Sequence, residues 1–86
     1  MGLDIVELVM EWEEAFSINI GDDEAATLST PAEVCDLVEQ KLQDANKSPG
    51  RDEIERLVRK ITIRQLGIAP DDYRIDARFV EDFRMD

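Results

Sequence analysis

Residues 3–16 read LDIVELVMEWEEAF, and their pattern indicates the class of fold. The apolar residues recur every three or four positions, which predicts a helix from Leu3 to Phe16 with one side in a core. The residues expected on that side are Ile5, Leu8, Val9, Trp12 and Phe16. A helix with one apolar side needs other elements to cover it, so further helices are expected downstream.

Residues 30–33, Thr-Pro-Ala-Glu, indicate the start of the next long helix. Thr30 suits the N-cap, Pro31 the first helical position, and Glu33 can reach back to complete a capping box. We expect this helix to end near Gln43. Before it, Asp22 or Asp23 is predicted to cap a short helical turn through Glu24 to Leu28.

A third long helix is predicted over residues 52–66, and Gly67 is a good stop signal. Asp52/Arg56 and Glu55/Arg59 have the acid-first spacing of four that supports a helix. Residues 68–86 have scattered apolar anchors and are predicted to form a long structured loop with one short turn.

The composition excludes several classes of protein. The 86 residues have room for one domain and carry a net charge of −11, which argues against nucleic acid and favours a basic partner surface. No apolar run approaches 20 residues, so no membrane span is expected. One cysteine and no histidine fit a reducing, cytoplasmic location without a disulfide or zinc site. We expect no catalytic residues, no metal and no enzymatic activity.

The charge is concentrated in the first half of the chain. Residues 1–42 contain eleven acids and one base, whereas residues 43–86 contain ten acids and nine bases. On the first helix the acids Asp4, Glu7, Glu11 and Glu14 lie roughly opposite the core side, and a second apolar strip separates them from it: Leu3, Val6 and Met10. This arrangement predicts a docking face for a basic partner with an apolar centre. The alternatives are an ordinary solvated face, or packing of Leu3 and Met10 under the C-terminal loop.

The order of these signals resembles an acyl carrier protein whose two halves are exchanged. Its second half is similar to residues 2–10 (GLDIVELVM), 13–16 (EEAF), 18–20 (INI), 22–25 (DDEA) and 28–31 (LSTP). Its first half is similar to residues 65–68 (QLGI) and 79–83 (FVEDF). The resemblance implies a small all-α bundle of three main helices and a short one, in circularly permuted order. Residues 1–42 would be the recognition-helix half, 43–50 a linker, and 51–86 the first-helix and long-loop half.

The resemblance also assigns individual residues. Gly2 stands where the family has the serine that carries phosphopantetheine, and Asp86 where it has the preceding aspartate, so we expect no cofactor although the family carries one. We expect Asp86 to lie close to Gly2. Partner contacts are implied for Leu3, Val6 and Met10 and for the acids Asp4, Glu7, Glu13 and Glu14, whereas Glu11 is an additional charge.

The function implied is a module that lacks the carrier serine and docks onto enzymes of acyl, fatty-acid or polyketide-type metabolism through its acidic helix. Two alternatives remain open: a genuine but atypical acyl carrier protein, and a structural homodimer that exchanges halves across the linker.

Overall fold

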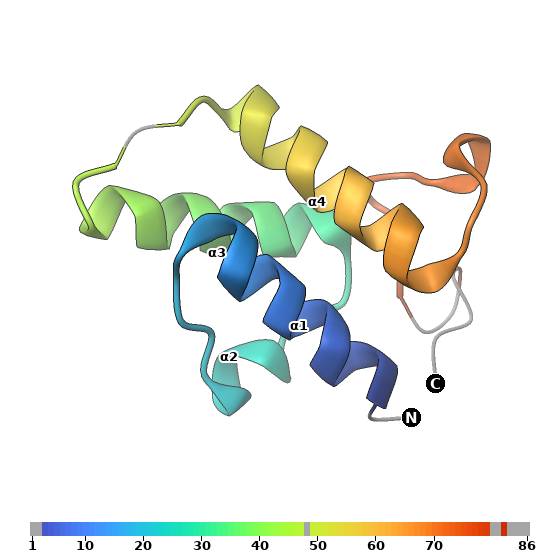
Figure 1. Ribbon diagram of the computed structural model, residues 1–86, viewed down its shortest axis with the longest axis horizontal. Helices are drawn as coiled ribbons and strands as arrows, with labels where there is room; N and C mark the ends of the chain where they lie inside the picture. Colours follow the sequence, from blue (N-terminus) through green and yellow to red (C-terminus); the bar gives the residue numbers. More distant parts are fainter. Residues whose placement is uncertain (1–2, 48, 80–81, 83–86) are drawn as a thin grey trace.

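The computed structural model describes residues 3–47, 49–79 and 82, and this part of the chain is helical without any strand (Figure 1). Its elements are α1 (Leu3–Phe16), α2 (Asp22–Ala25), α3 (Pro31–Asp44), α4 (Arg51–Leu66) and the 3₁₀ turn η1 (Pro70–Asp72). The prediction of an all-α bundle with three main helices and a short one is therefore confirmed. No helix in the described ranges is both long and apolar enough to cross a membrane.

The start of α3 follows the sequence signal. Thr30 Oγ1 accepts a hydrogen bond from the backbone N–H of Glu33 at 3.3 Å, and Glu33 Oε1 accepts one from the N–H of Thr30 at 3.2 Å. The same Glu33 oxygen accepts a hydrogen bond from the N–H of Ser29 at 2.6 Å. The capping box thus satisfies backbone donors that the helix itself leaves unpaired.

The short helix differs from the prediction at both ends. Its N-cap is Gly21, so the proposed cap at Asp22 or Asp23 is wrong, and the helix ends at Ala25. Glu24 Oε1 accepts a hydrogen bond from the N–H of Gly21 at 3.0 Å, which fixes the start one residue earlier. Asp22 and Asp23 instead lie in the first turn, where the helix dipole favours negative charge.

The ion pairs of α4 also differ from the prediction. Glu55 pairs with Arg51, at 2.8 Å, and not with Arg59. The guanidinium of Arg59 lies 5.7 Å from the centre of the Tyr73 ring and donates a hydrogen bond to the carbonyl of Pro70. The spacing of four residues is kept, but the observed pair has the base first, and Arg59 has its partners outside α4.

Helix α4 contacts both α1 and α3 (Figure 1). It ends at Gly67, whose φ of 67° is a left-handed conformation that glycine adopts without strain. The following segment contains the expected short turn, η1, and returns to the start of α3. The N–H of Phe79 donates to the carbonyl of Ser29 at 2.9 Å, and the N–H of Ala32 donates to the carbonyl of Ile75 at 2.8 Å.

The core fills the space between these elements. Trp12 of α1 and Phe79 are both buried, with ring centres 5.8 Å apart. Of the α1 residues predicted inside, Leu8, Val9, Trp12 and Phe16 are confirmed as buried, while the side chain of Ile5 lies outside the described structure. Thr62 is fully buried although its spacing did not single it out.

Candidate functional site

The exposed side of α1 carries an apolar strip. Val6 and Met10 are 52% and 54% exposed, whereas most large apolar side chains of the described structure are covered. Leu8 and Trp12 on the opposite side are fully buried. The helical period therefore places one apolar side against α4 and leaves a second one facing solvent, as the spacing predicted.

Of the other residues expected on this surface, several cannot be placed. The structure describes the backbone of Leu3 and Asp4 at the start of α1 but not their side chains. Gly2 and Asp86 lie outside the described residues, so their expected proximity stays a prediction.

The acids of α1 divide into two groups. Glu7 and Glu14 are exposed and form no ion pair within the described residues. Glu11 Oε1 instead pairs with Arg64 Nη2 of α4 at 3.0 Å. Glu13 Oε2 accepts a hydrogen bond from the backbone N–H of Ile20 at 2.7 Å, which ties α1 to the loop that follows it. Glu13 therefore has a structural role that the sequence did not indicate.

Shallow grooves flank the apolar strip on both sides. The groove toward α2, about 220 Å³, is lined by Val6, Val9, Met10 and Ala25 with carboxylates at its rim. The groove toward α4, about 210 Å³, is lined by Glu7, Met10, Glu11 and Gln65. Met10 lines both grooves, so its side chain lies between them.

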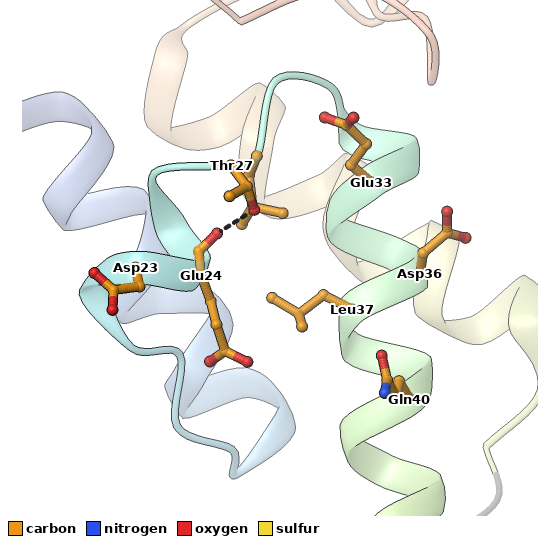
Figure 2. A pocket seen from close by; sticks show the side chains of 8 residues that line it. Asp23, Glu24, Thr27, Glu33, Asp36, Leu37 and Gln40 are labelled. Carbon is orange, nitrogen blue, oxygen red and sulfur yellow. Dashed lines mark hydrogen bonds between the residues drawn. The ribbon is translucent and has the colours of Figure 1, made fainter.

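A larger hollow of about 500 Å³ lies between α2 and α3 (Figure 2). Leu28 and Leu37 line it together with acidic residues, and sequence reasoning did not identify it. Most of its carboxylates have internal partners: Glu24 pairs with Lys41 at 2.9 Å, Asp36 pairs with Arg51 at 2.8 Å, and Glu33 caps α3. Within the described ranges no group of three or more His, Cys, Asp or Glu side chains could hold a metal ion.

The single cysteine, Cys35, is fully buried in α3. Burial raises the pKa of its thiol to about 11, against the opposing effect of the nearby Arg51 charge. The thiolate needed for nucleophilic chemistry is therefore scarce at neutral pH.

The chain is similar over part of its length to proteins named acyl carrier proteins. The chain is 43% identical over 42 residues to the acyl carrier protein of Amoebophilus asiaticus, covering 49% of this chain and 52% of the relative. It is 46% identical over 37 residues to that of Trieres chinensis, covering 43% and 46%. It is 53% identical over 36 residues to that of Rubrobacter xylanophilus, covering 42% and 44%.

These matches support a relationship to the acyl carrier protein family over part of the chain. The chain spans about half the length of the curated relatives that it matches. No family model matches it, and no solved structure gives a significant match.

Proposed function

We propose that this chain is an acyl-carrier-like module that docks, through α1, onto basic surfaces of enzymes that act on carrier proteins. The observation that carries the proposal is the exposed pair Val6 and Met10 beside Glu7 and Glu14, whose carboxylates form no ion pair with the residues that the structure describes. Apolar side chains supply binding energy when buried, and the carboxylates steer a basic partner toward them. The relatives named acyl carrier proteins suggest the class of partner.

We further propose that the chain is a circular permutation and that it does not carry phosphopantetheine at the position of the family's serine. Gly2 has no hydroxyl to carry the arm. The three threonine hydroxyls of the described residues are engaged or buried. Thr30 caps α3, Thr27 donates to the carbonyl of Glu24, and Thr62 is fully buried. Ser17 follows α1, whereas the family's serine precedes its recognition helix. A module of this kind, without phosphopantetheine, would compete with acyl-loaded carrier proteins for the enzymes that act on them.

The proposal is tested by titrating a purified enzyme that acts on acyl carrier proteins. We expect the native chain to bind and to inhibit transfer from a loaded carrier, whereas Val6→Ser with Met10→Ser binds at least about tenfold more weakly, since two apolar contacts are lost. Glu7→Gln with Glu14→Gln is expected to weaken binding mainly at low salt. Asp44→Asn with Glu53→Gln, at exposed positions at the end of α3 and the start of α4, makes the same change of net charge and is the control.

Two results would contradict the proposal. Equal binding by the native chain and the Val6→Ser, Met10→Ser variant would show that this side of α1 is only a solvated face. A mass increase of one arm after incubation with a phosphopantetheinyl transferase would show that the chain is an atypical carrier instead.

A further inference from the structure

Two rows of opposite charge lie on adjacent helices. The row on α1 consists of Glu7, Glu11 and Glu14, and the row on α4 consists of Lys60 and Arg64, spaced four residues apart. Both basic residues are exposed, and α1 contacts α4 (Figure 1). The acidic docking side is thus bordered by positive charge on its α4 flank, whereas Asp22 lies across the groove on its α2 flank.

The rows are joined by the pair between Glu11 and Arg64. The single contact, Oε1 to Nη2 at 3.0 Å, links residues 53 positions apart in the chain. The Arg64 side chain is 59% exposed and that of Glu11 is 36% exposed, so water screens the attraction. A partner can therefore compete for either member, but a cation brought to Glu11 meets the positive charge of Arg64 already there.

This arrangement distinguishes among basic partners. A partner that presents only lysines and arginines gains favourable contacts with Glu7 and Glu14. It also brings positive charges close to those of Arg64 and Lys60, which is unfavourable. A partner that also carries a carboxylate next to its basic residues matches both rows. Unfavourable pairings of this kind separate related partners more sharply than favourable contacts alone.

We propose that Arg64 is a specificity-determining residue that, with Lys60, selects enzymes whose basic docking patch includes a carboxylate facing α4. The proposal rests on the proposed docking function of α1. It changes the role expected for Glu11, which holds Arg64 in place at the edge of the surface and is not a primary contact for a partner's cation.

The test compares Arg64→Gln with Lys47→Gln, which makes the same change of net charge at an exposed position in the α3–α4 connection. Dissociation constants are measured at low and high salt against one purified enzyme that acts on acyl carrier proteins, whose docking patch contains a carboxylate, and against its variant in which that carboxylate is changed to an amide. The native chain is expected to prefer the unaltered enzyme by about two- to fivefold, the range of a surface ion pair, and Arg64→Gln to lose this preference. Lys47→Gln should keep it.

The remaining outcomes separate this proposal from the one on which it rests. If the native chain binds but Arg64→Gln keeps the preference, or changes as Lys47→Gln does, the role of Arg64 is wrong while docking through α1 stands. If the native chain binds neither form of the enzyme, both proposals fail. A concentration-dependent dimer that Arg64→Gln abolishes would assign the two rows to pairing between copies of this chain and overturn the selection of partners.

Discussion

At the scale of single residues, Cys35 shows how burial couples chemistry to stability. The thiol is fully buried, and its pKa is raised to about 11 mainly by the loss of water around it. The unfolded chain has no such environment, so the pKa of its thiol lies near the ordinary value of 9.0. The folded and unfolded states therefore bind different numbers of protons between these two pKa values.

We expect the free energy of unfolding to fall as the pH rises from about 9 to about 11, because the unfolded thiol loses its proton first. The contribution of Cys35 is at most roughly 2–3 kcal/mol over this window and absent below it. Urea unfolding of the native chain and of Cys35→Ala at pH 7.5, 9.5 and 10.5 measures it. The free energy of unfolding of the variant should fall less steeply with pH than that of the native chain. Equal slopes for the two proteins would contradict the role given to the Cys35 thiol.

Residue spacing predicted the core better than it predicted polar burial. Leu8, Trp12 and Phe16 lie inside as their period indicates, because apolar transfer decides their placement. Thr62 is fully buried on α4 although its hydroxyl gave no such signal. Its burial depends on which side of α4 faces both neighbouring helices, and that is a property of the assembled bundle.

At the scale of the elements, Arg51 links α3 to α4. Its guanidinium contacts Glu55 at 2.8 Å on its own helix, and Asp36 at 2.8 Å and Glu39 at 3.0 Å on α3. These hydrogen bonds to Glu55, Asp36 and Glu39 raise the pKa of Arg51, so its charge is permanent. One cation among three carboxylates stabilises more than an isolated surface pair, because removing it also leaves like charges close together.

Arg51→Gln should therefore lower the free energy of unfolding by about 1 kcal/mol at low salt, and by less in 1 M salt, where the charges are screened. Thermal and urea unfolding measure the change. Arg56→Gln, on the same helix and without an ion pair in the described ranges, is the matched control and should have little effect. A loss that is equal in both variants would mean that helix propensity, and not the network, is responsible.

The helix boundaries were largely predictable, whereas the contacts between helices were not. Thr30, Pro31 and Gly67 act within a few residues of the helix ends, so the local sequence contains the whole signal. Arg51 and Glu39 are twelve positions apart, and only the packing of α3 on α4 brings them together. The helical period also indicated a second apolar strip with Val6 and Met10, and both are exposed. It did not indicate the ion pair between Glu11 and Arg64, because only the packing of α1 on α4 brings these two residues together.

At the scale of the whole molecule, the proposed permutation makes a direct prediction. Removing Met1, changing Gly2→Ser and joining Asp86 directly to residue 2 would recreate the Asp-Ser-Leu sequence of the family. New ends can be opened after Lys47, because the connection between α3 and α4 is largely exposed and exposed loops tolerate new termini.

We expect this rejoined chain to form the same bundle, with a similar far-ultraviolet circular dichroism spectrum, and to gain one arm from a phosphopantetheinyl transferase by mass spectrometry. The rejoined chain that retains Gly2 is the control and should gain none. A rejoined chain that does not fold would contradict the proposed permutation. A folded chain with Gly2→Ser that stays unmodified would contradict the alignment of Gly2 with the family's serine.

The contact between Trp12 and Phe79 gives this molecule a built-in optical reporter. Trp12 is the only tryptophan, and it is fully buried on the helix whose other side presents Val6 and Met10. Its fluorescence should be blue-shifted while α1 is packed and should shift to the red when water reaches the ring. The state of the docking helix can therefore be followed in an unlabelled sample, in the same cuvette in which a tryptophan-free binding partner is added.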